Sequence, residues 1–370
     1  MKSYGVVLRI LHFKIIFLFF IGCASSQKLF LDETESVSKR NETLVKEEFK
    51  EEAAVFKKFK EIKPKSEKKK VQLNKAPGPR TGGPPPKSHR KLLPKKKKAK
   101  KTKAKKLEEV TSQGLSNYPA DYPDDFIDFD ERSEKFWHDF SPVLFTGEKA
   151  VLNVTYLGVD TGKIIISTKE DTVLGENPAF HVHARVKTAS FYSYLYEVDD
   201  YCDSFIKKDN FIPLKFSLIQ RQSSQNIDEL QLFDRDHLTV YSFYKRVTED
   251  KKKKKKTTEL TPRFFQDPLS FIYFLRGLPM KVGAEYVFPI VNKGEVEILS
   301  AKVEKKEFLE TKIGKKEAFR LKIFSGHKGD TIKGGSMLFW FSADAKKIFL
   351  QFNAEIKIGS IKGKIESYEF

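Results

Sequence analysis

The stretch Phe352-Asn353-Ala354-Glu355-Ile356-Lys357-Ile358 places an apolar side chain at every second position. The same alternation recurs at Leu230 and Leu232, and at Phe319, Leu321 and Ile323. A period of two with one polar face is typical of antiparallel β-strands. Glycines that signal turns recur between such stretches, at Gly158, Gly162, Gly294, Gly314 and Gly359. We therefore predict a mainly β domain over residues 131–370.

One segment of this region has the features of a helix instead, Asp267-Pro268-Leu269-Ser270-Phe271-Ile272-Tyr273-Phe274-Leu275-Arg276. Asp267 can cap it and Pro268 suits the first turn. Its apolar residues lie nearly all round, so we predict one short helix, buried against the sheet and ended by Gly277. The run Lys251–Lys256 is predicted to be an exposed hairpin loop.

The N-terminus resembles a secretory signal peptide. Lys2, Arg9, His12 and Lys14 precede the apolar run from Ile15 to Ile21, an order of charge and hydrophobicity that marks an export signal. The run is much shorter than the ~20 apolar residues that span a bilayer. We predict that residues 1–22 are a signal peptide.

Phe20-Ile21-Gly22-Cys23 resembles the lipobox of bacterial lipoproteins, although Phe20 stands where that family usually has Leu. The resemblance implies that Cys23 carries the lipid and becomes the mature N-terminus. The absence of Asp at Ala24 and Ser25 implies delivery to the outer membrane by the family's sorting rule. The alternative is cleavage near Ala24 or Gln27, which gives a soluble secreted protein.

Residues 23–130 are predicted to be a lipidated cysteine followed by a long disordered tether. The segment is rich in Lys, Glu and Pro and poor in apolar residues, so it cannot bury enough surface to offset its ordering entropy. A frayed helix over Glu47–Lys60 is the exception we allow. Residues 57–106 hold 22 Lys or Arg against two Glu, a net charge of +20, while the whole chain carries +19. The domain is therefore near neutral, and the tether would hold it well away from the membrane.

The run Lys95–Lys106 is the predicted contact for anions. Behind a secretory signal those anions are lipid phosphates, lipopolysaccharide or peptidoglycan carboxylates, and a solvated spacer is the alternative. No aromatic residues interleave the run, so base stacking is unsupported and no nucleic-acid partner is expected. The acidic and aromatic stretch 118–130 follows, either docking on the domain or meeting the Lys run. Pro119 and Pro123 argue against a helix across it.

Few residues of the domain point to chemistry. His181 and His183 share one face of a predicted strand and could form half a metal site, but their basic neighbours favour a water-facing role. Asp199, Asp200 and Asp203 flank Cys202, which admits a calcium loop or an activated thiol, with a polar turn as the simpler interpretation. Nearby carboxylates would raise the pKa of the thiol. We assign no catalytic, metal or cofactor-binding residue and expect no cofactor.

A resemblance to a known family rests on an ordered set of motifs. These are Gly147-Glu148-Lys149 with Tyr156-Leu157-Gly158-Val159, then Tyr196-Glu197-Val198-Asp199-Asp200, then Asp267-Pro268-Leu269-Ser270 with Leu275-Arg276, and Ser342-Ala343-Asp344-Ala345-Lys346-Lys347. Together they resemble the bacterial exported family called domain of unknown function 3108, over about residues 145–368. The resemblance implies a curved antiparallel sheet or open barrel, and export. It implies no activity.

These observations predict a membrane-anchored lipoprotein of the cell envelope with a β-rich binding or structural domain, and no enzymatic activity. An apolar-ligand or lipid carrier of the periplasm is one alternative, because the domain is rich in Phe. An enzyme that acts on the cell wall is another, because acids distant in sequence can meet in a fold. A nucleic-acid binder would require that residues 1–22 are not an export signal.

Overall fold

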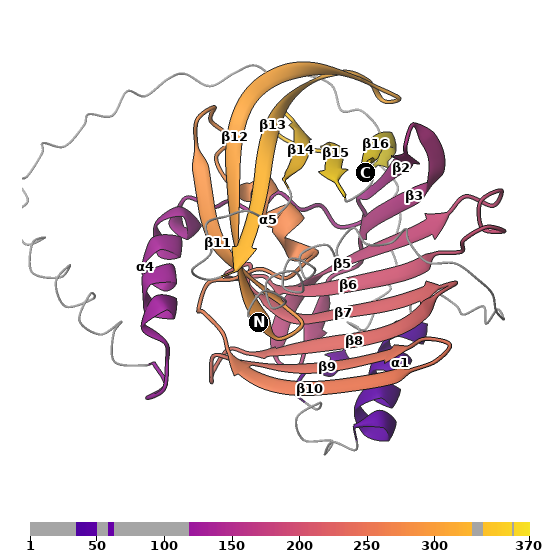
Figure 1. The fold of residues 1–370 in the computed structure, drawn as a ribbon. Coiled ribbons are helices and arrows are strands. Elements are labelled where there is room, and N and C mark those ends of the chain that lie inside the picture. Colours follow the sequence, from indigo (N-terminus) through magenta and orange to yellow (C-terminus); the bar gives the residue numbers. More distant parts are fainter. Residues whose placement is uncertain (1–34, 50–57, 63–117, 328–335, 357–358) are drawn as a thin grey trace, which may run out of the picture. The chain divides into compact units, whose positions relative to one another are not determined.

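Strands dominate the fold, and hydrogen bonds join them into one antiparallel sheet (Figure 1). A computed structural model describes residues 35–49, 58–62, 118–327, 336–356 and 359–370. Of these, residues 35–49, 58–62 and those from 121 onward belong to one compact unit, and residues 118–120 belong to a second. The first unit holds all the elements discussed below.

One half of the sheet follows the order β10-β9-β8-β7-β6-β5-β3-β2, in which neighbours pair antiparallel. A short strand, β4, pairs with β5 and carries the two-residue strand β1 on its other side. The strands are β1 (Glu61–Ile62), β2 (Lys149–Tyr156), β3 (Val159–Thr168), β4 (Thr172–Leu174), β5 (Asn177–Thr188), β6 (Asp199–Lys207), β7 (Pro213–Gln222), β8 (Gln225–Asp234), β9 (Thr239–Val247) and β10 (Lys252–Leu260).

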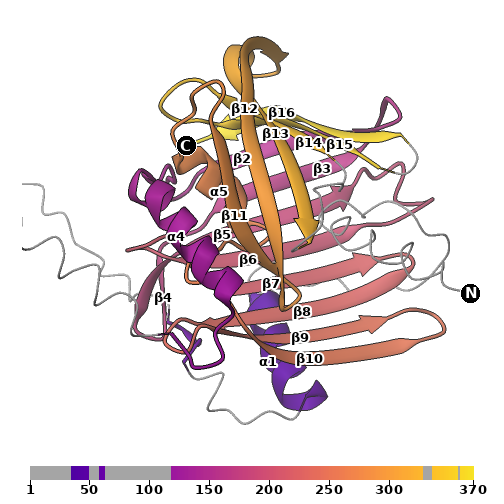
Figure 2. The same cartoon turned by 60° about the vertical axis from the view of Figure 1, so that its left-hand side comes forward.

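The other half continues from β2 in the order β16-β15-β14-β13-β12-β11. Its strands are β11 (Glu285–Asn292), β12 (Glu295–Thr311), β13 (Gly314–His327), β14 (Met337–Ser342), β15 (Phe349–Glu355) and β16 (Ser360–Glu369). Strands β10 and β11 are the two ends of this path among the described residues, so the curved sheet is not closed (Figures 1 and 2). The predicted fold class, a curved antiparallel sheet or open barrel, is confirmed.

The turn between β11 and β12 brings the two ends of the sheet together. Gly294 donates its backbone N–H to Oε1 of Gln231 on β8, at 3.0 Å. A Cβ at Gly294 would lie 2.6 Å from Oγ1 of Thr257 on β10. Lys255 of β10 forms an ion pair with Glu295 of β12. The turn therefore packs against the first half of the sheet and needs glycine for that close approach.

The main core lies on the side of the sheet that holds helix α5 (Ser270–Gly277), close to the predicted helix. Asp267 Oδ1 accepts hydrogen bonds from the backbone N–H groups of Leu269 and Ser270, as a capping residue does. Phe271 and Phe274 are fully buried. The helix is buried because aromatic and aliphatic side chains surround it, as its sequence predicted.

Helix α4 (Asp124–His138) corrects the prediction that the stretch 118–130 is not helical. Pro123 precedes the helix rather than interrupting it, because the first turn of a helix needs no N–H from that position. Asp130 is buried and accepts hydrogen bonds from the Tyr122 hydroxyl and the Arg263 backbone. The ordered domain therefore begins before residue 131, and residues 122–130 dock on it.

Two segments of the predicted tether also form structure on the sheet. Helix α1 (Glu35–Thr43) continues into the π-helix η3 (Leu44–Glu48), and α1 packs against β7 and β8 while η3 packs against β9. Leu44 and Val45 form a second apolar cluster with Phe59, Phe205 and Leu230. The prediction of disorder is wrong for residues 35–49 and 58–62. The rest of the tether up to residue 117 lies outside the described residues.

The prediction that the run Lys251–Lys256 is a hairpin loop is wrong. All but its first residue belong to the edge strand β10. Each of these five lysines pairs with a residue of β9, from Val247 to Phe243. Exposed lysines on an edge strand discourage pairing with another chain.

None of the helices in the described ranges is long and apolar enough to cross a membrane.

Candidate functional site

The candidate residues on β5 and β6 fall on two different faces of the sheet. His183 lies directly opposite Asp203 across the pair of strands, and Ala184 lies opposite Cys202. Successive side chains of a strand point to opposite faces. His181, His183 and Asp203 therefore share one face, while Asp200 and Cys202 point to the other. The interpretation of Asp199–Asp203 as a polar turn is wrong, since these residues begin strand β6.

Both histidines donate to the same carboxylate oxygen, Oδ1 of Asp203. The distances are 2.6 Å from His181 Nε2 and 3.0 Å from His183 Nδ1. Burial opposes ionisation of Asp203, but these two hydrogen bonds hold its pKa below the usual range. His183 is only 3% exposed, so the prediction that it faces water is wrong. A carboxylate partner allows this imidazole to lie inside.

This cluster lacks the geometry of a catalytic triad or a metal site. Ser217 lies opposite Asp203 on the side away from His183, so His183 and Ser217 are two strand spacings apart, about 10 Å. At that distance the imidazole cannot take the hydroxyl proton. No group of His, Cys, Asp and Glu within the described residues could hold a metal ion. Within the described residues, the cluster joins β5 to β6 through the Asp203 carboxylate.

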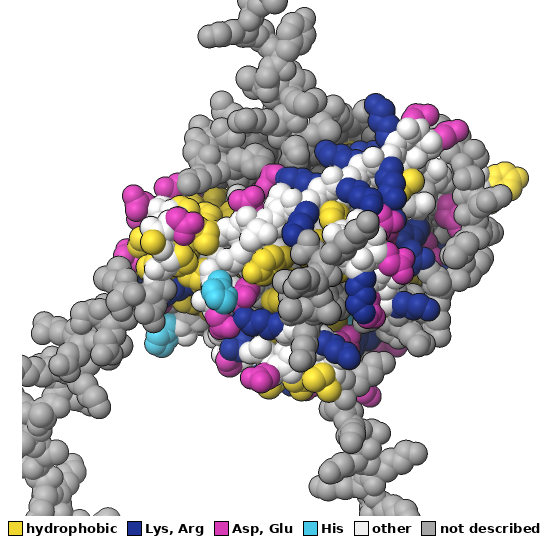
Figure 3. All heavy atoms as spheres, turned by 90° about the horizontal axis from the view of Figure 1, so that it is seen from below, with side chains coloured by type: hydrophobic (Ala, Val, Ile, Leu, Met, Phe, Trp, Pro, Cys, Tyr) yellow, Lys and Arg dark blue, Asp and Glu magenta, His cyan; other side chains and the backbone are white. Residues whose placement is uncertain are grey.

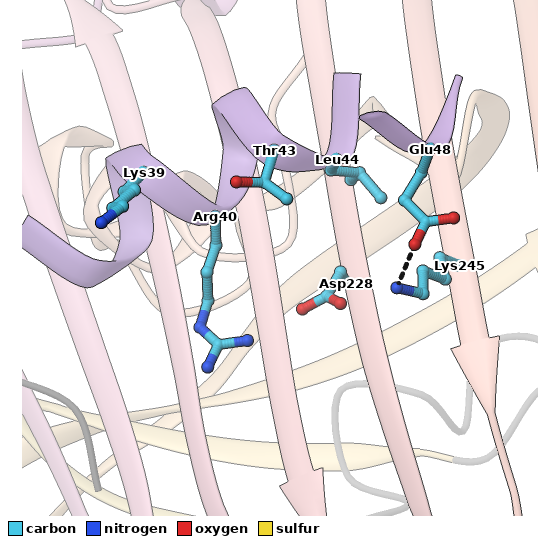
Figure 4. A pocket seen from close by; sticks show the side chains of 7 residues that line it. All are labelled: Lys39, Arg40, Thr43, Leu44, Glu48, Asp228 and Lys245. Atoms are coloured by element: carbon cyan, nitrogen blue, oxygen red, sulfur yellow. Dashed lines mark hydrogen bonds and ion pairs between the residues drawn. The ribbon is translucent and has the colours of Figure 1, made fainter. Parts of the chain in front are cut away.

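A pocket of about 310 Å³ opens on the same face, beside helix α1 (Figure 4). Its lining residues come from α1 and η3 on one side and from β8 and β9 on the other; they are Lys39, Arg40, Thr43, Leu44, Glu48, Asp228 and Lys245. The Arg40 side chain extends from the helix toward the sheet (Figure 4). The predicted tether thus supplies five of the seven lining residues.

Basic groups outnumber acidic groups around this pocket. Glu48 forms ion pairs with three lysines, and Asp228 forms one with Arg221. Six bases thus surround two carboxylates; the bases are Lys39, Arg40, Arg221, Lys245, Lys252 and Lys254. Lysine and arginine side chains, with acidic ones among them, are spread over the surface seen from below (Figure 3). The excess positive charge suits an anion.

Burial and a neighbouring cation lower the pKa of Arg40. Its guanidinium is partly removed from water, and the charge of Arg221 is close enough to oppose protonation further. Hydrogen bonds from Lys245 and Lys254 lower the pKa of Glu48 to about 2. The charge of Asp228 opposes the effect of Arg221 on Arg40, and a bound anion would relieve the repulsion between the two arginines further.

Sequence reasoning missed this pocket because Lys39 and Arg40 sit in a charged segment with little apolar content. The apolar residues that dock the segment, Leu44 and Val45, follow the α-helix in η3, and that short pair was the available signal. Cys23 and Lys95–Lys106 lie outside the described residues, so the predicted lipidation and anion contact stay predictions.

The opposite face of the first half of the sheet carries buried acidic groups. Burial raises the pKa of Asp200 to about 7 and the pKa of Glu229 to about 6. Burial, together with Asp267 and other carboxylates, raises the pKa of the Cys202 thiol well above its ordinary value. Cys202 is therefore a poor nucleophile, in agreement with the effect predicted for its acidic neighbours.

Three of the sequence motifs meet in one buried network. Arg276 donates through Nη1 to Oε1 of Glu148 at 2.6 Å and through Nη2 to Oε2 at 3.2 Å. Nη2 also donates to the backbone carbonyl of Lys346 at 2.7 Å. Both side chains are almost completely buried. The motifs around residues 148, 276 and 346 therefore hold the fold together rather than form a reactive centre.

Comparison with known proteins gives one family match. The model of the family described as "Protein of unknown function (DUF3108)" matches residues 151–366. No curated protein matches the chain.

Three solved structures resemble it at low sequence identity. A β-barrel-like protein of the domain of unknown function DUF1849 from Brucella abortus has 14% identity and a TM-score of 0.40, covering 61% of this chain and 98% of its own. A proposed lipoprotein from Parabacteroides distasonis has 9% identity and a TM-score of 0.29, covering 62% and 100%. A proposed exported protein from Bacteroides fragilis has 11% identity and a TM-score of 0.29, covering 62% and 99%.

Proposed function

This chain belongs to the DUF3108 family of proteins of unknown function, and on that premise we propose that it is a lipid-anchored protein of the bacterial cell envelope. Cys23 carries the lipid, and the β domain acts as a binding module rather than an enzyme. The outer membrane is the proposed location. The basic run Lys95–Lys106 contacts anionic lipid, lipopolysaccharide or peptidoglycan.

The docking of α1 on the sheet is the observation that carries this proposal. Only eleven residues, 24–34, separate Cys23 from Glu35, where α1 begins. Such a segment spans at most about 40 Å when fully extended. An anchor at Cys23 therefore holds the domain next to the bilayer. The sequence predicted a tether from Cys23 to residue 130 that would hold the domain far from the membrane. Because α1 already packs on the sheet, only the residues between Cys23 and Glu35 connect the lipid to the domain.

The pocket beside α1 gives the module a ligand class, a phosphate-bearing or other anionic group. Arg40 and Lys39 belong to the element nearest the anchor, so the pocket lies within reach of headgroups. Arg40 supplies the planar donors that bind phosphate oxygens in pairs. Glu48 and Asp228 already have cationic partners, which leaves Arg40 and Lys39 for the ligand.

Metabolic labelling with palmitate tests the anchor. The native host would express the wild type, Cys23→Ala and Cys202→Ser, and we expect label in the wild type and Cys202→Ser but none in Cys23→Ala. Cys202 is the matched control because it is the other cysteine of the chain and lies in strand β6. An unlabelled wild type would overturn lipid anchoring and leave a secreted protein.

Charge reversal tests the pocket. We expect Lys39→Glu/Arg40→Glu to weaken binding of inorganic phosphate and of short-chain phosphatidylglycerol by more than tenfold in calorimetric titrations. Lys281→Glu/Lys302→Glu, which makes the same change of charge at exposed positions elsewhere, should bind as the wild type does. Equal losses in both variants would mean a general charge effect and no site. Binding of the lipid but not of free phosphate would identify the headgroup as the ligand.

The alternatives have less support. A lipid carrier needs an apolar cavity, but Phe216, Phe233 and Phe288, among other Phe residues, are packed within the core with at most 1% of each exposed. A cell-wall enzyme needs converging acid and base groups at a cleft, whereas the His–Asp cluster is covered and lacks a nucleophile within reach. Binding at the pocket remains the chemistry that the arrangement favours.

A further inference from the structure

Exposed apolar side chains gather at one rim of the sheet. Nine large apolar side chains are exposed among the described residues, and five of them lie in two neighbouring turns. This apolar rim consists of Leu157 and Val159 at the β2–β3 turn, and of Phe191, Tyr194 and Leu195 in the β5–β6 loop. Tyr194 is 89% exposed and Phe191 is 80% exposed. Such a concentration marks an interaction surface.

The two turns are held side by side. The backbone N–H of Ala189, where the β5–β6 loop begins, donates to the carbonyl of Thr161 on β3 at 2.9 Å. Both turns project on the right-hand side in Figures 1 and 2. Segments that are separated by about thirty residues in sequence therefore present one apolar surface.

The β5–β6 loop holds its apolar residues outward by a set of internal bonds. The N–H groups of Tyr192 and Ser193 both donate to the carbonyl of Ala189. At its far end, the backbone N–H of Glu197 donates to the Ser223 hydroxyl of the β7–β8 turn, and the Ser223 N–H donates to the Glu197 carbonyl. The Tyr196 hydroxyl bonds to the Ser224 hydroxyl at 2.8 Å. The exposure of Phe191 and Tyr194 is thus built into the loop.

Charged residues flank the apolar rim. Lys163 and Lys187 are exposed and lie opposite each other on β3 and β5, close to the two turns. Asp160 and Glu197 are the carboxylates within the turns, and Asp160 already accepts a bond from Asn153. The pocket beside α1 borders the same rim, because its Asp228 and the paired Arg221 lie next to the β7–β8 turn.

We propose that the apolar rim docks on the surface of an anionic lipid bilayer, with Phe191, Tyr194 and Leu195 entering the headgroup region. Tyr and Phe suit that depth, since their rings are apolar and the Tyr hydroxyl stays wet. Lys187 then faces lipid phosphates, while Lys163 is paired with Glu366. This inference rests on the proposed function, because the anchor twelve residues before α1 keeps the rim within reach of the bilayer.

An environment-sensitive fluorophore at the loop tip tests the docking. The probe is attached to Tyr194→Cys in a Cys202→Ser background of the full chain, purified from the host and mixed with phosphatidylethanolamine–phosphatidylglycerol vesicles. The control probe is placed at Phe308→Cys, which is 65% exposed on β12 and belongs to neither turn of the rim. We expect a blue shift and several-fold protection from iodide quenching at residue 194 only.

The outcomes separate the docking from the anchor. A chain that sits on vesicles through its lipid while residue 194 stays as quenchable as residue 308 would overturn the docking and leave the anchor intact. A shift at residue 194 in a chain without lipid would support the docking although the anchor fails. A shift that appears without vesicles and rises with protein concentration would mean self-association and would also overturn the proposal.

A substitution in the loop provides a second measurement. Phe191→Ser/Tyr194→Ser/Leu195→Ser changes only exposed side chains, so the fold and its melting temperature should be unchanged. We expect vesicle binding of the unlipidated chain to weaken by roughly tenfold per side chain that enters the headgroup region. Binding equal to that of the wild type would contradict the proposal.

Discussion

Removal of the Glu148 carboxylate should destabilise the domain strongly. The side chains of Arg276 and Glu148 are 2% and 3% exposed, and they share two hydrogen bonds. In Glu148→Ala the guanidinium stays buried, with the Lys346 carbonyl and the face of Tyr273 as its remaining neighbours. Breaking one partner of a buried ion pair costs about 3–5 kcal/mol. Since a domain has about 5–15 kcal/mol of stability, the loss is a large fraction of the total.

Urea denaturation followed by tryptophan fluorescence measures this cost. With a slope of about 3 kcal/mol/M, the midpoint should fall by roughly 1–1.7 M. Glu317→Ala is the matched control, because Glu317 forms an ion pair of similar length with Lys306, but the two side chains are 43% and 41% exposed. Such surface pairs contribute about 0–1 kcal/mol. Midpoints that fall equally in both variants would refute the reasoning from burial.

Two further substitutions test the packing of the β11–β12 turn on the first half of the sheet and the ionisation of a buried acid. Gly294→Ala places a Cβ 2.6 Å from Thr257, and the control Gly314→Ala shares the positive φ but meets no neighbour. In chemical denaturation, Gly294→Ala should lower the unfolding free energy by about 1–3 kcal/mol more than Gly314→Ala does. Burial raises the pKa of Glu229 from 4.5 to about 6, so the folded state holds its proton longer. The contribution of Glu229 to the unfolding free energy is greatest below pH 4.5 and falls as the pH rises to 6. Glu229→Gln should therefore flatten the dependence of the unfolding free energy on pH between 4.5 and 6. An unchanged slope in that range would contradict this prediction.

The β domain was predictable because its evidence is local. Alternation at Phe319–Ile323 and Leu230–Leu232 marks strands without knowledge of their partners, and these segments form β13 and β8. The Asp267-Pro268 start of α5 is equally local, since the cap bonds groups two and three residues away. Signals of this kind survive in a single sequence.

The pocket and the His–Asp cluster depend on contacts between distant residues, which alternation does not encode. His183 reads as a water-facing residue among basic neighbours until Asp203, twenty residues later, is placed opposite it. Helix α1 is charged along most of its length, and its docking depends on the apolar Leu44 and Val45 that follow it. Composition therefore predicted a tether where tertiary contacts hold a helix.

The positions of α1 and α4 in the chain change the role that we assign to the basic residues 63–117. Strand β1 ends at Ile62 and helix α4 begins at Asp124, and both elements belong to the same compact unit. If Cys23 is lipidated, as we propose, residues 63–117 therefore do not set the distance between the lipid and the domain. That distance is set by the eleven residues between Cys23 and α1. A short connection to a lipid on Cys23, as proposed, would hold the pocket and the apolar rim near the bilayer.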